Sequence, residues 1–252
     1  LADRLGAARL ATGHYARLAG DSGGKLVRRA ADPAKDQSYM LARLSPSILD
    51  RLEFPLGELT KPRVRELARA ARLPVAERPE SQDLCFLAGT SGPDFLARHG
   101  GGASPGEVVD LAGRRLGTHG GHHLFTVGQR RGLGVASGEP LYVVRKDPRR
   151  GRVVVGPRSA LDVTRVEVAG ATLHRPAAEV DTVKLRYRSR PVRTRVEEDA
   201  GPGRHRRLTL TLAEPVQGVA PGQVACLMRG DEVVGAATIR PQSTAKEEPL
   251  AV

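Results

Sequence analysis

The sequence has no tryptophan, and aromatic residues make up only 3% of it. Its buried cores must therefore be aliphatic, built mainly from Leu, Val and Ala. No apolar run approaches the roughly 20 residues that a helix needs to cross a bilayer. No signal-peptide pattern opens the chain either. These absences predict a cytoplasmic protein with aliphatic cores and no contact with a membrane.

Cysteine is scarce as well, since the chain contains only Cys85 and Cys226. Two thiols are too few for a disulfide framework of the secreted type or for a cysteine-based zinc site. The count allows one disulfide, although no feature of the sequence points to it. Cys226 lies in the alternating run VACLM, which is typical of a half-buried strand. Cys85 follows ESQD, where a helical pattern gives way to a loop, and Arg78 would favour its thiolate, so Cys85 is the candidate for a reactive thiol.

Acidic residues are outnumbered, because 28 Asp and Glu stand against 40 Lys and Arg, which gives a net charge of +12. Between Arg145 and Arg207 the chain has 17 Lys and Arg against 8 Asp and Glu, a net charge of +9. A surplus of this size favours a polyanionic partner, because each neutralised phosphate releases condensed counterions. The alternative is a soluble protein that happens to be rich in arginine. Charge therefore favours nucleic acid as the partner without saying which kind.

The length of 252 residues predicts two domains, or three small ones. In the first third of the chain, strand and helix patterns alternate, which favours an α/β layer. The clearest helix is expected to begin after Thr60, with Pro62 in its first turn, and to end at Leu73. Its expected apolar face consists of Val64, Leu67, Ala68 and Ala71. The other expected elements are a strand that ends in a loop at 9–17, a turn at 20–24, a strand at 25–28, a helix at 35–44 with Tyr39, Met40, Leu41 and Leu44 available for burial, and a helical continuation at 46–52.

Beyond Cys85 the sequence is first rich in glycine and then alternates between apolar and polar residues almost to its end. Short alternating strands separated by turns are typical of a small barrel or sandwich. The expected elements are a hairpin at 107–116 around Gly113, strands at 141–145 and 152–155 that pair across a turn at Asp147, strands at 180–188, 192–197, 207–212 and 224–228, and a last hairpin that turns at Gly230. The tail at 242–252 is expected to be disordered.

Two further patterns resemble functional motifs at first sight. The SGGK segment at 22–25 lacks the GxxxxGK[ST] spacing of a phosphate loop and the Asp-Ser of an adenylating PP-loop, so a hairpin turn is favoured. His119, His122 and His123 lie close together, but no carboxylate or thiol accompanies them at ligand spacing. A loop with hydrogen-bonding or RNA-facing roles is therefore favoured there, and no metal site is predicted.

Seven short segments carry more specific information when they are taken in order. They are LATGHYAR at 10–17, KDQSYML at 35–41, FPLGELTKPRVRELA at 54–68, ESQDLCFL at 80–87, FTVGQRRGLGV at 125–135, RYRSRP at 186–191 and APGQ at 220–223. The ordered set, which runs from about Arg9 to Arg240 without large gaps, resembles the bacterial tRNA-specific 2-thiouridylases (MnmA type). Each segment alone is a weak signal, whereas the set is specific.

The resemblance implies a fold class of α/β plus β in three parts. Residues 1–88 would be the carboxy-terminal remainder of a PP-loop (adenine nucleotide alpha hydrolase-like) domain, residues 89–162 a small central domain, and residues 163–241 an RNA-binding β-barrel. Enzymes of this family adenylate the wobble uridine 34 of tRNA with ATP and magnesium, after which a cysteine persulfide delivers sulfur and AMP leaves. The expected partners are the anticodon arm of tRNA and a protein that donates persulfide sulfur.

Matching the family's motifs position by position assigns roles to residues of this chain. Cys85 matches the cysteine that bears the persulfide, and Gly13 matches a glycine whose backbone approaches ATP. The positions that match RNA contacts are His14, Lys35, Asp36, Gln37, Arg186, Tyr187 and Gln223. Tyr187 would stack on a base while Arg186 takes phosphate charge. A persulfide suits the reaction because it is nucleophilic at neutral pH, and the uridine oxygen leaves only after ATP has converted it to an adenylate.

Two features of the family are absent from the sequence. They are the SGGxDSS phosphate loop and an upstream cysteine that pairs with the persulfide cysteine, and both would lie before Leu1. The chain alone is therefore expected neither to bind ATP tightly nor to thiolate RNA. A non-catalytic RNA-binding protein of the same architecture is one alternative. Another PP-loop enzyme, such as an amidotransferase-type synthetase, is a second, although the ordered QDLCF, GQRRGLG and APGQ segments argue against it.

Overall fold

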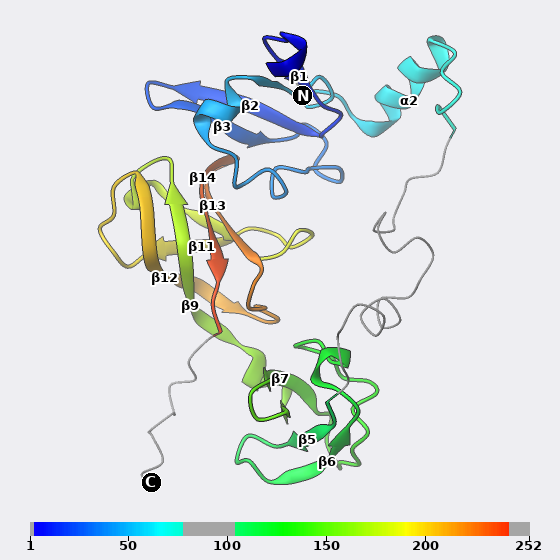
Figure 1. Cartoon of the computed structure of the whole chain (residues 1–252), viewed down its shortest axis with the longest axis vertical. Coiled ribbons are helices and arrows are strands. Elements are labelled where there is room, and N and C mark those ends of the chain that lie inside the picture. Colours follow the sequence, from blue (N-terminus) through cyan, green and yellow to red (C-terminus); the bar gives the residue numbers. More distant parts are fainter. Residues whose placement is uncertain (1–2, 78–103, 242–252) are drawn as a thin grey trace. The chain divides into compact units, whose positions relative to one another are not determined.

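The computed structural model describes residues 3–77 and 104–241 of the chain. These residues belong to two compact units, and many of their elements are labelled in Figure 1. Unit 1 contains residues 3–77, 164–215 and 219–241, and unit 2 contains residues 104–163 and 216–218. Unit 1 therefore combines the first part of the chain with most of its last part. Cys85, the start of the expected central domain and the expected tail at 242–252 lie outside the described residues.

A closed β-barrel of six strands lies in unit 1 (Figure 1). Its strands follow the order β13-β10-β11-β12-β9-β14, and pairing of β13 with β14 closes the ring. They are β9 (Val163–Leu173), β10 (Thr182–Lys184), β11 (Val192–Val196), β12 (Gly203–Val216), β13 (Val224–Arg229) and β14 (Glu232–Ile239). The interior is aliphatic, with Val168, Leu210 and Leu227 fully buried. The barrel predicted from the alternating sequence is confirmed.

The first part of the chain adds a hairpin to this barrel. Strands β2 (Ala16–Asp21) and β3 (Gly24–Arg29) pair with each other, and Arg28 of β3 pairs with Glu232 of β14. The SGGK segment thus forms a hairpin turn, as predicted. An apolar cluster joins the two parts of the chain. Its buried members are Ala16, Val27, Tyr39, Leu41, Ala42 and Leu49 from the first part and Cys226, Met228, Val233 and Ala236 from the barrel.

Residues 35–44 form consecutive turns instead of the predicted helix. The cause is Asp36, whose side chain takes hydrogen bonds that would otherwise be available to a helical backbone. The carboxylate of Asp36 accepts hydrogen bonds from the N–H groups of Ala30 and Ser38 at 3.1 and 3.2 Å. Met40, which a helix was expected to help bury, is 63% exposed.

The neighbouring elements are shorter than the sequence predicts. They are η1 (Asp3–Leu5), β1 (Leu10–Ala11), α1 (Pro46–Leu49) and β4 (Leu52–Glu53), and β1 pairs with β4 in parallel. The strand predicted at 9–17 is divided by a loop at 12–15, and the helix predicted at 46–52 is a single turn. Ser45 starts that turn, and its hydroxyl accepts a hydrogen bond from the N–H of Ile48 at 3.4 Å.

Helix α2 (Lys61–Ala70) begins directly after Thr60, as predicted. The Thr60 side chain makes no capping hydrogen bond, and the Asp32 carboxylate instead accepts one from the N–H of Lys61 at 2.9 Å. Within the part of the chain that the structure describes, no residue of α2 is buried, and Leu67 of the predicted apolar face is 43% exposed. Across residues 3–77 and 104–241, the helices are too short or too polar to span a bilayer.

Unit 2 is built on a mixed sheet with the strand order β6-β5-β8-β7 (Figure 1). Its strands are β5 (Gly106–Val109), β6 (Arg115–His119), β7 (Tyr142–Asp147) and β8 (Arg152–Gly156). Strands β5 and β8 are parallel, and the other pairs are antiparallel. The predicted hairpins at 107–116 and across Asp147 are confirmed. The core contains Val108, Phe125, Leu133, Val143, Val153 and Val155. Further 3-10 helices among the described residues are η2 (His122–Leu124), η3 (Arg158–Leu161) and η4 (Ala177–Glu179).

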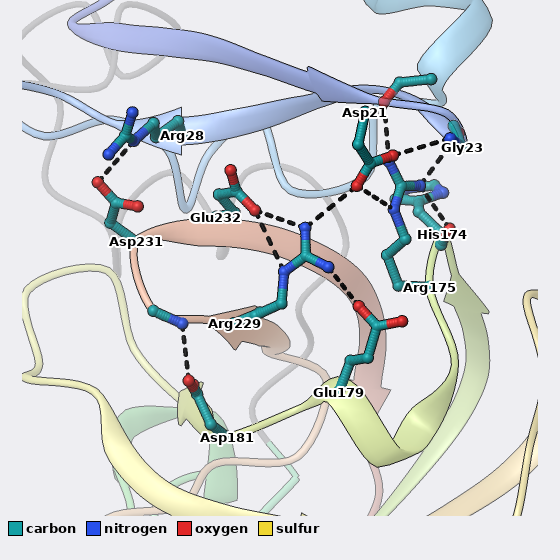
Figure 2. Close-up of polar contacts among 12 residues, drawn as sticks. Asp21, Gly23, Arg28, His174, Arg175, Glu179, Asp181, Arg229, Asp231 and Glu232 are labelled. Carbon is teal, nitrogen blue, oxygen red and sulfur yellow. Dashed lines mark hydrogen bonds and ion pairs between the residues drawn. The ribbon is translucent and has the colours of Figure 1, made fainter.

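A buried arginine fastens the β2–β3 hairpin to the barrel (Figure 2). The side chain of Arg175, which is 7% exposed, forms an ion pair with Asp21 and donates to the carbonyl oxygens of Gly23 and Gly24 at 3.1 and 2.8 Å. The hydrogen bond from Arg175, helped by the N–H of Gly23, lowers the pKa of Asp21 to about 2. The stabilisation of the fold by the ionised Asp21 carboxylate is complete above its ordinary pKa of 3.8 and is lost as the pH falls toward 2.

A second arginine extends this network. Figure 2 shows the guanidinium of Arg229 between the carboxylates of Glu232, Glu179 and Asp21. Arg229 donates to Glu232 at 2.7 Å and to Asp21 at 3.3 Å, and it forms an ion pair with Glu179. These carboxylates, Glu232 first, raise the pKa of Arg229 above its ordinary value. Charged contacts therefore reinforce the apolar cluster where the hairpin meets the barrel.

We expect Arg175→Met to lower the free energy of unfolding by about 2 kcal/mol. Breaking a fully buried pair costs more, but the Asp21 side chain is 40% exposed and keeps part of its hydration. Urea unfolding followed by circular dichroism measures the change. The matched control is Arg190→Met, because Arg190 and its partner Glu214 are 78% and 50% exposed and such a pair contributes roughly 0.5 kcal/mol. Equal effects of the two substitutions would contradict the role given to Arg175.

Candidate nucleic-acid interface

Three segments that the sequence assigns to RNA contact meet around Tyr39. The Tyr39 hydroxyl donates to the carbonyl oxygen of Val224 at 2.9 Å, next to Gln223. The Tyr39 ring lies 6.2 Å, centroid to centroid, from the ring of Tyr187. Tyr39 itself directly follows the KDQS segment. The structure therefore brings the predicted positions at 35–37, 186–187 and 223 to one region of unit 1.

A buried ion pair fixes two of these segments against each other. The Nζ of Lys184 lies 3.5 Å from the carboxylate of Asp36, and the two side chains are only 8% and 2% exposed. Asp36 also accepts a hydrogen bond from the Ser38 hydroxyl at 2.9 Å, and Arg29 lies 3.7 Å from it. The carboxylate is thus used within the fold, where it holds the 35–39 loop. Lys184 ends β10 and so positions the turn that follows it.

That turn displays the predicted pair Arg186 and Tyr187. The strand predicted at 180–188 ends at Lys184, and Arg186 begins a turn instead. The Ser189 hydroxyl closes it by accepting from the N–H of Arg186 at 3.2 Å and donating to the Arg186 carbonyl at 3.0 Å. Both side chains are exposed, Tyr187 by 38%. In an alternating strand one of the two would face the interior, so the turn is what leaves both available to a ligand.

The loop at 12–15 is tied to the same region through Gln37. The Gln37 side chain accepts a hydrogen bond from the N–H of Tyr15 at 2.9 Å, and the Gln37 N–H donates to the Tyr15 carbonyl at 2.8 Å. His14 precedes Tyr15, and its Nδ1 lies 3.0 Å from the Thr12 hydroxyl. A Cβ on Gly13 would meet only Leu56, at 3.9 Å, so packing among the described residues does not require glycine there.

Gln223 lies in an exposed turn that leads into β13. Its carbonyl oxygen accepts a hydrogen bond from the N–H of Ile239 at 2.8 Å, which holds the backbone of the turn against β14. Gly222 has φ of +85°, in the left-handed region that favours glycine. The APGQ segment therefore presents the Gln223 side chain to solvent from a backbone that is fixed in place.

Tyr39, Lys184 and Arg43 are the residues of this region that the sequence reasoning did not assign. Burial raises the pKa of Tyr39, and the charges of Arg43 and Arg186 lower it only in part, so its hydroxyl remains a hydrogen-bond donor at neutral pH. Arg43 donates to the Thr238 hydroxyl at 2.6 Å. Tyr39 could have been found from the sequence because it lies inside the KDQSYML motif, whereas no local sequence pattern marks Lys184.

Of the two thiols, the structure describes Cys226. Cys226 is free, fully buried in β13 and part of the apolar cluster. Burial raises the pKa of its thiol to about 12, so it is protonated and unreactive at neutral pH. The predicted core position of Cys226 is confirmed. Cys85 lies outside the described residues, so its reactivity stays a prediction.

The histidines of unit 2 do not form a common site. His119 is 7% exposed and packs its ring 5.4 Å from the ring of Phe125, so it belongs to the edge of the core and not to an RNA-facing loop. Burial lowers the pKa of His119. The rings of His122 and His123 lie 6.1 Å apart. Within residues 3–77 and 104–241, no group of three or more His, Cys, Asp or Glu side chains has a geometry that would hold a metal ion.

The glycine-rich segment 125–135 is explained by its own loop geometry. The Gln129 side chain accepts a hydrogen bond from the N–H of Thr126 at 2.9 Å, and its carbonyl accepts one from Val143 at 2.9 Å. Gly128, at φ of +88°, donates back to the Val143 carbonyl at 2.8 Å. These bonds close the loop against β7 and account for Gly128 and Gln129 of the motif.

Comparison with family models covers most of the chain in three consecutive matches. Residues 1–89 match the tRNA methyl transferase HUP domain, residues 93–157 the tRNA methyl transferase PRC-barrel domain, and residues 161–239 the aminomethyltransferase beta-barrel domain. The predicted fold class, the end of an α/β nucleotide-hydrolase-like domain followed by a central domain and a β-barrel, is confirmed. The predicted boundaries at 88 and 162 stay predictions.

Individual relatives agree with these matches. A protein of Methylobacterium sp. (strain 4-46) named tRNA-specific 2-thiouridylase MnmA is 46% identical over 97% of this chain and 66% of its own length. The protein of the same name from Rhodospirillum centenum is 46% identical over 92% of this chain and 61% of its own length. The bifunctional protein NifU/MnmA of Rubrobacter xylanophilus is 45% identical over 95% of this chain. The chain spans at most 66% of the length of these relatives.

We expect Asp36→Asn to lower the free energy of unfolding by about 3 kcal/mol, because it leaves the Lys184 charge buried without a counter-charge. Urea unfolding measures this. The matched control is Asp50→Asn, whose carboxylate is 60% exposed and 3.9 Å from Lys25, and we expect a change of roughly 0.5 kcal/mol there. Adding Lys184→Met to Asp36→Asn removes both charges and should recover part of the loss. An Asp36→Asn variant as stable as its control would refute this account of the pair.

Proposed function

This chain belongs to the tRNA-specific 2-thiouridylase family, and from that premise we propose that it forms the RNA-holding and sulfur-carrying part of an enzyme that 2-thiolates uridine 34 in tRNA. The observation that carries the proposal is the convergence of three predicted RNA-contact segments on Tyr39. The enzyme acts in the cytoplasm on the anticodon arm and receives sulfur from a protein that carries a persulfide.

The surface around Tyr39 has the chemistry that a single-stranded anticodon loop requires. Tyr187 offers an exposed ring on which an unstacked base can lie. Arg186, beside it, offers a guanidinium to a phosphate, and no Asp or Glu among the described residues forms an ion pair with it. Gln223 adds an amide that can both donate and accept hydrogen bonds. Lys35, His14 and Gln37 extend the surface along the loops that Gln37 ties together.

The proposed reaction uses Cys85 as the sulfur carrier. The C2 oxygen of the uridine first attacks the α-phosphate of ATP, with Mg²⁺, and pyrophosphate leaves; this adenylation is needed because an amide oxygen is a poor leaving group. The terminal sulfur of a Cys85 persulfide then attacks C2, and AMP leaves with the original oxygen. A second cysteine thiolate breaks the sulfur–sulfur bond of the persulfide and ends in a disulfide with Cys85, while the sulfur stays on the uridine. A reductant restores the two thiols.

Two features of this chain limit what it can supply to that reaction. Cys226 is unsuited to be the second cysteine, because its thiol is fully buried with a pKa of about 12. Toward an ATP site, this chain would contribute the backbone at Gly13, which neighbouring side chains do not closely cover. We therefore propose that residues outside this chain provide the second cysteine and most of the ATP site. The chain alone would bind RNA without thiolating it.

Thiol labelling separates the two cysteines. We expect one thiol of the native chain to react rapidly with a chromogenic disulfide reagent at pH 7.5, and none to react in Cys85→Ser until urea unfolds the chain. The reason is that the Cys226 thiol has no access to solvent. Cys226→Ala is the matched control and should keep the rapid reaction, with a loss of stability of roughly 1 kcal/mol. Rapid labelling of native Cys85→Ser would overturn the assignment.

RNA binding tests the proposed function directly. We expect Arg186→Ala to weaken binding of a tRNA transcript and to reduce the slope of log K against log salt by about 0.7 to 0.9, the value for one phosphate contact. Fluorescence anisotropy at several salt concentrations measures both. The matched control is Arg190→Ala, because Arg190 is already paired with Glu214 at 2.8 Å. If Arg186→Ala changes the slope no more than Arg190→Ala does, Arg186 is not a phosphate contact; if the native chain does not bind tRNA, the proposed function fails.

A further inference from the structure

A basic pocket lies in unit 1 beside the start of β12. Its volume is about 490 Å³. Small residues line part of it, namely Ala42, Gly170, Ala171, Thr172 and Ala236, and basic side chains line the rest, namely Arg43, His174, Arg204, His205 and Arg206. No Asp or Glu is among the lining residues. The pocket is separate from the positions at 35–37, 186–187 and 223 that were assigned above.

One face of strand β12 changes from apolar to basic residues where the strand reaches this pocket. Alternate residues of a strand share one face. On one face of β12, Leu212, Leu210 and Leu208 are buried in the barrel, and the next two positions on that face are Arg206 and Arg204, which are exposed. The face that forms the barrel core thus becomes a row of guanidinium groups at the end of the strand, where the pocket begins.

A bulge in β9 opens the other side of the pocket. The register of β9 against β14 shifts between the pairs Thr172–Ala236 and Ala169–Thr238. Gly170 lies at this shift with φ of +57°, and a Cβ built on it would meet nothing within 4 Å. A bulge bends its strand and leaves one residue unpaired. The wall of the pocket at Gly170 is therefore open space bordered by backbone and not by a large side chain.

The charge of the pocket comes from arginines that the fold does not neutralise. Arg204 and Arg206 have no hydrogen bond or ion pair with any other residue that the structure describes, and Arg43 bonds only the Thr238 hydroxyl. Burial, with the nearby Arg175 charge, lowers the pKa of His174, which is therefore neutral at pH 7. Unpaired guanidinium groups without a carboxylate nearby match the geometry and charge of phosphate oxygens.

The position of Arg43 indicates whose phosphates these are. Arg43 follows Ala42, which packs in the same apolar cluster as Tyr39. Arg43 also donates to the hydroxyl of Thr238, which pairs with Val224, and the Val224 carbonyl accepts the hydrogen bond from Tyr39. The pocket therefore adjoins the surface around Tyr39, so that an RNA strand lying on Tyr187 and Arg186 could extend toward it.

We propose that Arg204 and Arg206, together with Arg43, bind backbone phosphates of the RNA whose bases lie on the surface around Tyr39. This inference rests on the proposed function. It adds a second anchoring point to that surface, outside the seven positions assigned from the family motifs. Because guanidinium groups contact phosphates without reading bases, the pocket contributes affinity and orientation but not sequence preference.

The test is the salt dependence of tRNA binding by the full 252-residue chain carrying Arg204→Ala and Arg206→Ala together. We expect weaker binding and a slope of log K against log salt that is smaller by about 1.4 to 1.8, the value for two phosphate contacts. The matched control removes two arginines of the same barrel that are already paired, Arg165 with Glu197 at 2.9 Å and Arg190 with Glu214 at 2.8 Å. The control has the same net charge as the double variant, and we expect it to keep most of the native slope.

The outcomes separate this inference from the proposed function. A slope that falls in Arg186→Ala but equals the control in the Arg204→Ala/Arg206→Ala variant overturns the pocket and leaves RNA binding intact. Absence of tRNA binding by the native chain overturns both. If the double variant keeps native tRNA affinity but loses binding of inorganic pyrophosphate measured by calorimetry, the pocket is a small-anion site and the RNA assignment is wrong. Because both arginines are exposed, we expect the double variant to unfold at the native urea concentration.

Discussion

The buried ion pair between Asp36 and Lys184 is the contact on which the arrangement of unit 1 depends. Burying two charges is favourable only when hydrogen bonds replace the lost water, and Asp36 receives them from Ala30, Ser38 and the Ser38 hydroxyl. Those same bonds turn residues 35–44 away from a helix. The partner, Lys184, ends β10 and sets the position of the turn that carries Arg186 and Tyr187. One pair of charges thus places a loop of the first domain beside a loop of the barrel.

In unit 1, charged contacts fix how the first part of the chain is aligned with the barrel, and apolar contacts hold the two parts together. The cluster around Met228 and Tyr39 buries side chains from both parts of the chain, but apolar packing alone tolerates small shifts. Arg175 and Arg229 have fixed geometry, because each guanidinium contacts several acceptors at once (Figure 2). Together, these two kinds of contact explain why the hairpin of an α/β domain and a β-barrel form one compact unit here. It also means that an RNA contact made by either part is aligned with contacts made by the other.

The sequence predicts what local pattern determines and fails where distant contacts decide. Alternation identified most barrel strands because a closed barrel buries every second residue, as in β12, where Leu208, Leu210 and Leu212 are buried. Strand β9 was not predicted because the bulge at Gly170 shifts the alternation of apolar and polar residues along it. The helix expected at 35–44 failed because Asp36 has its partner in β10. Family motifs named Arg186, Tyr187 and Gln223 as contact residues, yet their meeting around Tyr39 depends on long-range bonds that no local pattern encodes.

The central claim is that three segments form one RNA-binding surface. Amide hydrogen exchange of the chain, measured with and without a tRNA transcript, tests this most directly because it reports on all segments in one experiment. The account predicts slower exchange on RNA binding at 35–44, 186–189 and 220–223 together, with no change in the sheet core of unit 2. Protection confined to one of these segments, or protection elsewhere while all three exchange as before, would contradict it.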